Sequence, residues 1–543
     1  MNDWVTIAEQ PIADAGRRFQ ELQAQLRHYA ASVDLSDLDD RDILVIPSFS
    51  LDQQQLEKVS GFLHYEERLL FSLIRLRSPY TRLIYVTAQP LCPAIVDYYL
   101  QLLPGIPFSH ARDRLMLLAA YDSSLKPLSQ KILERPRLIE RIRKALRADK
   151  SYMVCFNSSP LEQELSLRLG IPLLACSPDL LYWGTKSGSR EIFATAGVPH
   201  PDGSPLVWSE PDLLEAAATV WERQPQLQRL AIKLNEGFSG EGNAILDLRS
   251  LARVAPGISA ASHAERVAAL RDCLPTLSFQ AREETWAHFG RRVTDLGAIA
   301  EAFIEGEVKR SPSVQGYIAP NGAVEILSTH DQILGGPDGQ IYLGCRFPAD
   351  AAYRLPLQTY GLQVGEVLAA KGAIERYSVD FIAVQEPRTQ AWSLEAIEIN
   401  LRKGGTTHPF MTLKLLTNGH YDFTSGLFYG QQGQEKYYIA SDNLQKPHYR
   451  GLLPSDLMDI ITRHRLHFDS SNRTGTVFHL MGALSEFGKL GLTSIGNSLE
   501  EAEAQFARVE EVLDAETAAH TQEAYTSPLL PSPPLPITWL GGD

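Results

Sequence analysis

The stretch AWSLEAIEINLRKGGTTHPF, residues 391–410, places acidic, amide and basic side chains at alternate positions. Apolar residues alternate with the others through its first half, which is the period of a half-buried strand. On that period Glu398 and Asn400 share one face, and Arg402 returns to the same face two residues later. Carboxylate and amide oxygens suit magnesium, and an arginine suits a phosphoryl oxygen. The stretch therefore predicts a site for a metal ion and a phosphate group.

The preceding segment, ERYSVDFIAVQEPRTQ, reads as the partner strand of a hairpin with a turn-rich tip. If the tip centres near Thr389, Asp380 pairs directly with Glu398, and Asn400 lies one step along the same face. A slip of one residue would move Asp380 to the opposite face. One alternative is a satisfied polar network on a solvated sheet face. Because neighbouring carboxylates repel one another, we favour a magnesium site.

A second hairpin is predicted over RLAIKLNEGFSGEGNAILDL, where Lys233 stands on an alternating strand before a glycine-rich loop. Such a loop can close backbone N–H groups over phosphate oxygens. Its candidate nucleotide-binding residues are Gly237, Ser239, Gly240 and Gly242. It is not a P-loop, because no Gly-Lys-Ser/Thr leads into a helix. Taken alone, a lysine at a strand edge beside a flexible turn is the simpler explanation.

Two further stretches hold weaker signals. GAIAEAFIEGEVKRS is an apolar strand that ends in Glu301, followed by Phe303 and Glu307. Such carboxylates can accept hydrogen bonds from an exocyclic amine and from ribose hydroxyls, although surface glutamates at a turn are commoner. His330 and Asp331 in STHDQ could line a substrate pocket or accept a proton from an amine. A structural hydrogen-bonded pair is the alternative, and both remain open.

The whole chain has the composition of an ordinary soluble protein, with 44% apolar and 21% charged residues among 543. No apolar run is long enough for a membrane span, and the N-terminus lacks a secretory pattern, so a cytoplasmic protein is expected. Five scattered cysteines predict neither a disulfide framework nor a structural zinc site. The formal charge of −14 repels nucleic acid and anionic membranes at long range.

The distribution of apolar runs, helical segments and glycine-rich turns along the chain predicts an α/β and α+β multidomain protein. Short apolar strands alternate with helices over 1–180, which indicates a Rossmann-like, doubly wound domain, but the dinucleotide fingerprint is missing. Within it HYEERLLF is typical of an amphipathic helix with solvated or paired charges. A helix closed by Gly197, followed by strands and glycine-rich turns, is predicted over 181–425. A small α+β domain is expected over 426–520, with a helix that starts at a capping box at Ser498. Residues 521–543 form a proline-rich tail.

The order of these elements resembles that of ATP-grasp enzymes. It runs through Lys186, Lys233, Glu301, Glu307, Asp380, Glu398 and Asn400. The stretches GFLHYEERLLF, STHDQILGG, YLGCRFPA, EINLRKGGTTHPFMTL and FHLMGALSEFGKLGLTSIG also resemble the peptide ligases of the pheganomycin type. That resemblance spans nearly the whole chain. It implies a Rossmann-like pre-ATP-grasp domain, an ATP-grasp ligase domain and a small C-terminal domain.

The resemblance also implies roles for individual residues. Lys186 and Lys233 would contact ATP phosphates, Glu301 the adenine amine, and Glu307 the ribose. Asp380, Glu398 and Asn400 would hold two magnesium ions, with Mn²⁺ as a substitute. Many ATP-grasp ligases carry an arginine two residues before the first metal aspartate, where this chain has Ser378. The candidates for the missing cation are Arg402 and Arg346.

The implied activity is an ATP-dependent carboxylate–amine ligase that forms an amide through an acylphosphate and releases ADP and phosphate. Its substrates would be small molecules, an amino acid or short peptide among them. A kinase that uses the same cleft and a non-catalytic ATP-binding regulator are the alternatives. The sequence leaves the substrates unidentified, and a homodimer stays open as the oligomeric state.

Overall fold

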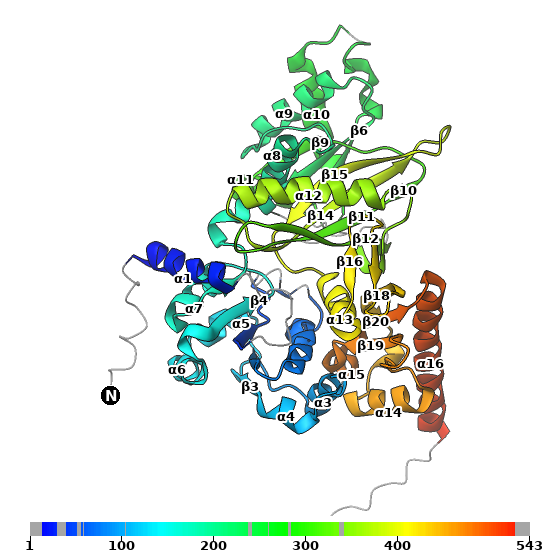
Figure 1. The fold of residues 1–543 in the computed structure, drawn as a ribbon. Coiled ribbons are helices and arrows are strands. Elements are labelled where there is room, and N and C mark those ends of the chain that lie inside the picture. The colour runs from blue at the N-terminus through cyan, green and yellow to red at the C-terminus, as the bar shows by residue number, and fades with distance from the viewer. Residues whose placement is uncertain are drawn as a thin grey trace, which may run out of the picture.

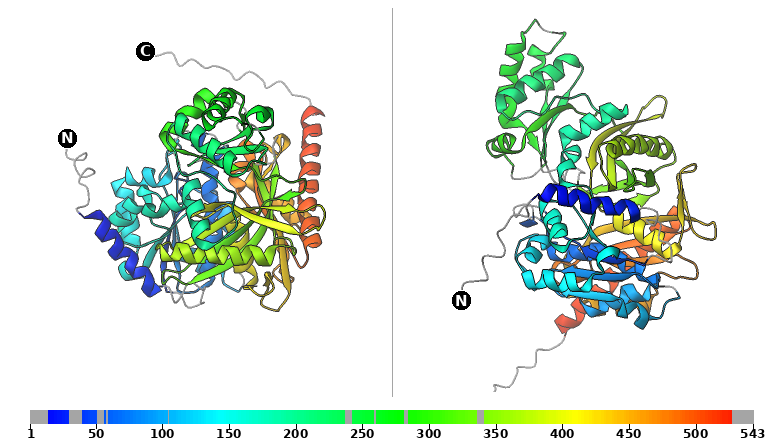
Figure 2. Two further views of the ribbon diagram at one scale, coloured as in Figure 1. Left: turned by 90° about the horizontal axis from the view of Figure 1, so that it is seen from above. Right: turned by 60° about the vertical axis from the view of Figure 1, so that its left-hand side comes forward.

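The computed structural model describes residues 14–29, 40–50, 56–57, 59–103, 105–236, 242–258, 260–280, 284–335 and 341–526. Three of the predicted loop residues, Gly237, Ser239 and Gly240, lie outside these ranges, as does most of the proline-rich tail. Figure 1 shows the chain from the N-terminal part (blue) to the C-terminal helix (red), and Figure 2 shows it from two further sides.

A five-stranded parallel sheet organises the N-terminal part, in the order β3-β2-β1-β4-β5. Its strands are β1 (Asp42–Ile46), β2 (Arg82–Thr87), β3 (Leu115–Ala119), β4 (Ser151–Cys155) and β5 (Leu173–Leu174). The helices of this part are α1 (Ala15–Tyr29), η2 (Phe62–Arg77), α3 (Pro93–Gln101), α4 (Phe108–Asp113), α5 (Leu128–Leu133), α6 (Pro136–Ala145), η3 (Ala148–Lys150) and α7 (Pro160–Leu169). The central strand β1 is buried along its whole length, as in parallel sheets covered on both faces. The predicted doubly wound sheet is confirmed.

The helix η2 differs from its prediction. HYEERLLF was expected to form an amphipathic helix with solvated or paired charges. Instead η2 has 3₁₀ geometry, and both of its glutamates, Glu66 and Glu67, are buried. The backbone N–H of Ala88 donates to Glu66 (2.5 Å) and that of Gly482 donates to Glu67 (3.1 Å). The element is therefore part of the core, and tertiary packing rather than local period decides its geometry.

A four-stranded antiparallel sheet forms a separate layer at the top of Figure 1, in the order β8-β7-β6-β9. Its strands are β6 (Arg229–Leu234), β7 (Asn243–Asp247), β8 (Ser278–Phe279) and β9 (Ala298–Ala302). The helical elements that precede or accompany it are η4 (Pro178–Gly184), α8 (Lys186–Ala196), α9 (Glu210–Arg223), η5 (Arg249–Val254), α10 (His263–Cys273), η6 (Leu274–Thr276) and α11 (Trp286–Leu296). As predicted, Gly197 closes α8, with φ of 68°.

An 11-stranded antiparallel sheet forms the centre of the molecule. Its strands are β10 (Lys309–Arg310), β11 (Pro312–Ile318), β12 (Val324–Gly335), β13 (Ile341–Phe347), β14 (Glu375–Gln385), β15 (Trp392–Asn400), β16 (His420–Asp422), β17 (Leu427–Tyr429), β18 (Glu435–Gln445), β19 (Gly475–His479) and β20 (Lys489–Gly496). The helix α12 (Arg354–Ala370) packs on β11 and β12. Because β13 pairs with β18, the sheet continues from the middle of the chain into its C-terminal part.

The C-terminal part packs against both the large sheet and the N-terminal part. Its remaining helical elements are α13 (Thr407–Thr417), η7 (Pro447–Tyr449), α14 (Pro454–His464), η8 (Met481–Ala483), α15 (Leu484–Phe487) and α16 (Leu499–Thr526). The long helix α16 lies along β18 and β20. At its start the Glu501 N–H donates to the Ser498 hydroxyl, as the predicted cap requires. One hydrophobic core joins η2, α13 and β20, so the two ends of the chain support the same side of the molecule.

Candidate active site

A large cleft of about 1810 Å³ lies between the four-stranded sheet and the 11-stranded sheet. Side chains from β6 and β9 line one wall, and side chains from β14 and β15 line the other. The connection after β9, which includes Phe303, passes along the cleft from one sheet to the other. The cleft also reaches residues of the N-terminal part and of the C-terminal part. All four regions of the chain therefore meet at one space.

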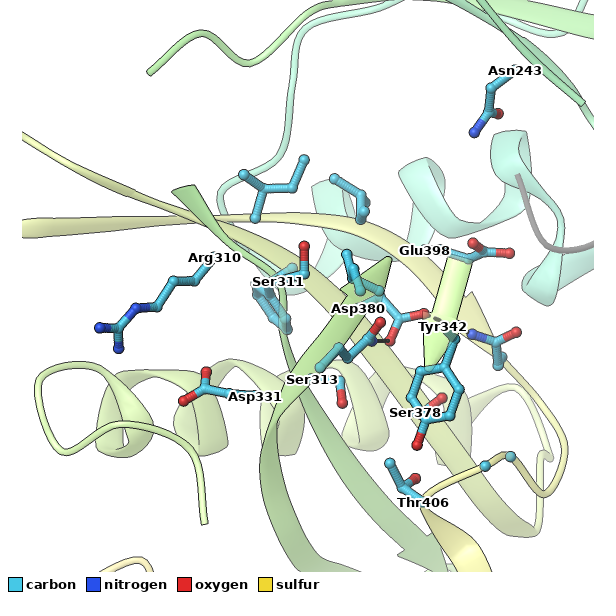
Figure 3. A pocket seen from close by; sticks show the side chains of 18 of the residues that line it. Asn243, Arg310, Ser311, Ser313, Asp331, Tyr342, Ser378, Asp380, Glu398 and Thr406 are labelled. Atoms are coloured by element: carbon cyan, nitrogen blue, oxygen red, sulfur yellow. Dashed lines mark hydrogen bonds between the residues drawn. The ribbon is translucent and has the colours of Figure 1, made fainter. Parts of the chain in front are cut away.

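The hairpin of β14 and β15 has the register expected from its sequence. Asp380 pairs with Glu398, and Ser378 pairs with Asn400, so all four lie on the cleft side of the hairpin. The Asn400 amide donates to Asp380 (3.1 Å), and the Gln332 amide on β12 donates to its other oxygen (2.8 Å). Figure 3 shows Asp380 and Ser378 with Tyr342 and Thr406 on one side and Arg310 and Asp331 on the other. The donor set is oxygen-rich and hard, which is the chemistry that magnesium prefers.

The negative charge of the two carboxylates on this hairpin also favours the binding of a cation. Burial and the neighbouring Glu398 raise the pKa of Asp380 to about 7, although Arg402 and Lys186 act in the opposite direction. Two carboxylates on adjacent strands destabilise each other unless a positive charge lies between them. A divalent cation at this position reverses that effect. Within the described ranges, no group of three or more His, Cys, Asp and Glu side chains gathers as a metal cluster, so the donors here are two acids and an amide.

Lys186 is positioned by contacts from both sheets. It begins α8, where its backbone N–H donates to the Asn235 carbonyl (3.1 Å) after β6. Farther along α8, the Ser189 hydroxyl accepts from the Ile399 N–H of β15 (3.0 Å). These bonds hold the lysine ammonium 2.5 Å from the Glu398 carboxylate. A predicted phosphate ligand and a predicted metal ligand thus lie side by side.

A second ionic group lies on the four-stranded sheet. Ala231 pairs with Glu301, which puts Lys233 diagonally across from Glu301 on the same face. The Lys233 ammonium lies 2.5 Å from one Glu301 oxygen, and Arg190 of α8 donates to the other at 2.9 Å. Although burial favours the neutral acid, the two cations hold the pKa of Glu301 below its ordinary value. Arg190 belongs to no recognisable motif, so sequence patterns alone do not select it.

The other predicted nucleotide-binding residues divide into two groups. Gly242 and Phe303 line the cleft, and the guanidinium of Arg229 stacks 4.0 Å from the Phe303 ring centroid. Glu307 is exposed and does not line the cleft, so the geometry does not bring it to Glu301. Its contact with ribose stays a prediction.

Arg402 and Arg346 both line the cleft. Burial lowers the pKa of Arg402 from its ordinary value, while the negative charges of Glu398 and Asp380 raise it. This places Arg402 in the electric field of the carboxylate hairpin. Arg346 instead lies 3.0 Å from Glu503 of α16 and is about half exposed. Arg402 is thus the better placed of the two to meet charge that develops at the hairpin.

His330 does not line the cleft. The ring is fully buried, packs at a tilt against the Phe347 ring and shares a hydrogen bond of 2.6 Å with the Tyr438 hydroxyl. Burial lowers the pKa of His330 to about 3, so the imidazole is neutral at neutral pH. Its neighbour Asp331 does line the cleft, where it accepts from the Tyr353 hydroxyl (2.6 Å). The pair therefore separates into one core residue and one cleft residue.

The comparisons with known proteins identify the family of the chain. The family profile described as IQCH-like, ATP-grasp matches residues 180–424, and the profile of the PGM1 C-terminal domain matches residues 456–509. L-propargylglycine--L-glutamate ligase of Streptantibioticus cattleyicolor is 30% identical over 470 residues, which is 85% of this chain and 91% of that protein. This chain belongs to the ATP-grasp carboxylate–amine ligases. As a member of this family, the ligase uses ATP.

Two further similarities extend the comparison. The ligase is 23% identical over 518 residues to IQ motif-containing protein H of Danio rerio, and it spans 88% of its own length but 49% of that protein. Among solved structures, the ADP complex of N5-carboxyaminoimidazole ribonucleotide synthetase has a TM-score of 0.48 at 13% identity, over 88% of this chain and 98% of that one. No helix in the parts of the ligase that the structure describes is long and apolar enough to cross a membrane.

Proposed function

We propose that this ATP-grasp ligase joins the carboxylate of one amino acid or short peptide to the amine of another. The relative named for L-propargylglycine and L-glutamate supports amino acids as the substrate class. The observation that carries the proposal is the convergence of Asp380, Glu398 and Lys186 at one end of the cleft, with Lys233 and Glu301 on the facing sheet. That pattern suits a nucleotide whose phosphates point toward the carboxylate hairpin.

Each residue then has a defined task. Lys186 and Lys233 bind phosphate oxygens, and Glu301 lies where it can accept from the adenine amine. Asp380, Glu398 and Asn400 hold magnesium, which we propose binds as two ions and which Mn²⁺ can replace. When bound, the metal supplies positive charge beside the transferred phosphoryl group.

The chain itself orients the reactants. Arg402 binds the γ-phosphoryl oxygens as a substrate carboxylate oxygen attacks phosphorus and ADP leaves. The amine of the second substrate then attacks the acylphosphate carbonyl, inorganic phosphate leaves with the bonding electrons, and an amide remains. The reaction needs no protein nucleophile. For His330 we propose a structural role in the core, since it is buried against Tyr438 and outside the cleft lining.

The test is a product screen. Purified ligase is incubated with ATP, magnesium and all pairs drawn from the twenty common amino acids and L-propargylglycine, and both phosphate release and product mass are recorded. A product whose mass equals acid plus amine minus water, formed together with ADP, supports the proposal. A phosphorylated single substrate would instead identify a kinase. Binding of ATP without turnover of any pair would count against ligation of amino acids.

A further inference from the structure

The end of the cleft beyond the carboxylate hairpin is built from segments far apart in the sequence. We call it the distal pocket and define it by Tyr65 and Arg68 of η2, Phe156 after β4, Asp442 of β18 and Lys489 of β20. All five residues line the same cleft as Asp380 and Glu398. The N-terminal and C-terminal parts therefore contribute side chains to the same cleft as the two sheets.

The two cations of the distal pocket differ in their partners, because Arg68 contacts a carboxylate and Lys489 contacts a hydroxyl. Arg68 forms an ion pair with Asp442 and stacks 4.0 Å from the centroid of the Tyr65 ring. Lys489 is only 5% exposed, and its ammonium donates to the Tyr65 hydroxyl at 2.7 Å. No carboxylate of the described residues forms an ion pair with it.

The other deeply placed lysines of this cleft differ from Lys489. Lys186 is paired with Glu398, and Lys233 is paired with Glu301. Burying an ammonium without a counter-charge costs free energy, because the protein interior solvates a charge less well than water does. Lys489 is thus a nine-tenths buried cation that faces a cavity and lacks an anion. An anionic group of a bound molecule can supply the missing charge.

The position of this cation relative to the reacting groups follows from its neighbours. Burial lowers the pKa of Arg402, and the positive charge of Arg68 lowers it further, so the distal pocket adjoins the residue proposed to bind the phosphoryl group. Tyr342 lines the cleft beside Gly405, where an added Cβ would lie 2.8 Å from the tyrosine ring. The space between the hairpin and the distal pocket therefore depends on the close approach of Gly405 to Tyr342.

When two amino acids are joined by an amide bond, the carboxylate of the amine substrate takes no part in the reaction and stays ionised. The reaction uses one carboxylate and one amine, so the amine substrate keeps its own carboxylate throughout. We infer that Lys489, held by the Tyr65 hydroxyl, binds this unreacted carboxylate, and that the amine substrate is an amino acid or peptide rather than a simple amine. This inference rests on the proposed ligation, and it names the substrate class that the distal pocket selects.

The experiment compares each amino acid with its carboxamide as the amine substrate, in the wild type and in Lys489→Met. The wild type is expected to use the amino acid with a KM about 30-fold or more below that of the amide, the effect of pairing a buried charge. Lys489→Met should raise the KM for the amino acid by a similar factor and leave both the KM for the amide and the KM for ATP unchanged. Equal use of acid and amide by the wild type would overturn the inference.

Two variants make the result specific. Tyr65→Phe keeps the ring and removes only the hydroxyl bonded to Lys489, so it should raise the same KM by a smaller factor. Lys446→Met is the matched control, because Lys446 is already paired with Glu510 and Asp514 and does not line the cleft. An increase in KM for the carboxylate substrate instead of the amine substrate would also overturn the inference.

A binding measurement separates this inference from the proposed ligation. Saturation-transfer NMR records contact between the protein and a pool of the twenty amino acids, and then a pool of their amides, with no turnover required. Stronger transfer to the acids in the wild type, abolished in Lys489→Met, would support the distal pocket even if no pair were ligated. Equal transfer to both pools would reject the pocket even if ligation were found.

Discussion

The ammonium of Lys186 lies 2.5 Å from the carboxylate of Glu398, although the two residues come from different elements, the start of α8 and the strand β15. The lysine is predicted to bind phosphate and the glutamate to bind metal. Magnesium and a phosphate oxygen carry the opposite charges to these two partners, so each can replace one member of the pair. Binding of the metal–nucleotide therefore exchanges one ion pair for two new ones, without leaving a buried charge unpaired.

Glu398→Gln removes the negative charge from this arrangement and keeps the shape of the side chain. We expect ligation to fall by at least about 100-fold, because the metal loses a charged ligand beside the transferred phosphoryl group. The measurement is ADP release at saturating ATP over a range of magnesium concentrations. A requirement for more magnesium at half-maximal rate would trace the loss to the metal.

Glu386→Gln is the matched control for that variant. Glu386 follows β14 at the exposed tip of the same hairpin, and the same chemical change there should leave both the rate and the magnesium dependence as in the wild type. Full activity of Glu398→Gln at ordinary magnesium concentrations would contradict the metal assignment.

Lys233→Met should act on nucleotide binding. Its ammonium faces the cleft from β6 and is held by Glu301, so its removal takes one cation from the phosphate path without touching the carboxylate hairpin. We expect the KM for ATP to rise about 10-fold or more, with a smaller change in kcat. Unaltered affinity for ATP, measured by calorimetry, would show that this lysine is structural.

Glu301 predicts a dependence of stability on pH. Its pKa is held below the ordinary value of 4.5, since Lys233 and Arg190 outweigh the effect of burial. A lowered folded-state pKa contributes stability that is present above pH 4.5 and is lost as the pH falls through the folded-state value. The difference in Tm between wild type and Glu301→Gln should therefore be largest near pH 7 and shrink as the pH falls below 4.5. A constant difference in Tm across that range would mean that Glu301 is not ionised by its two cations.

The sequence was sufficient where the interactions were local. The turn-rich tip near Thr389 predicted the hairpin of β14 and β15, and the predicted pairing of Asp380 with Glu398 is confirmed, although a register shift between Asp380 and Phe381 separates this pair from the pairs nearer the tip. The same holds for the end of α8 at Gly197, which adopts a left-handed conformation that favours glycine. In these cases the residues that decide the structure lie within a few positions of one another.

The sequence was insufficient where the partner residue lies far along the chain. The segment that contains Arg68 was predicted to carry solvated or paired charges, but nothing in it indicated the partner, which is Asp442 of β18. Lys489 gave no signal, because a lysine at the start of a strand is ordinary until its surroundings are known. His330 looked equally suited to a pocket and to the core, and only the pairing of β13 with β18 brings Tyr438 to its ring. Burial and charge pairing of this kind depend on tertiary structure, which periodicity does not encode.

Arg402 and His330 are both candidate catalytic residues, and the structure allows their roles to be separated by experiment. Arg402→Lys keeps a positive charge but loses the planar fork that binds phosphoryl oxygens, so we expect kcat to fall about 100-fold while the KM for ATP changes little. His330→Gln should change kcat by less than about 3-fold. It should also lower the Tm, because it disturbs a buried hydrogen bond whose loss costs roughly 1–3 kcal/mol of folding free energy. Steady-state kinetics and thermal unfolding of the two variants give the answer together. A collapse of kcat in His330→Gln at an unchanged Tm would return the histidine to the catalytic machinery, because a residue that only supports the core cannot lose activity without losing stability.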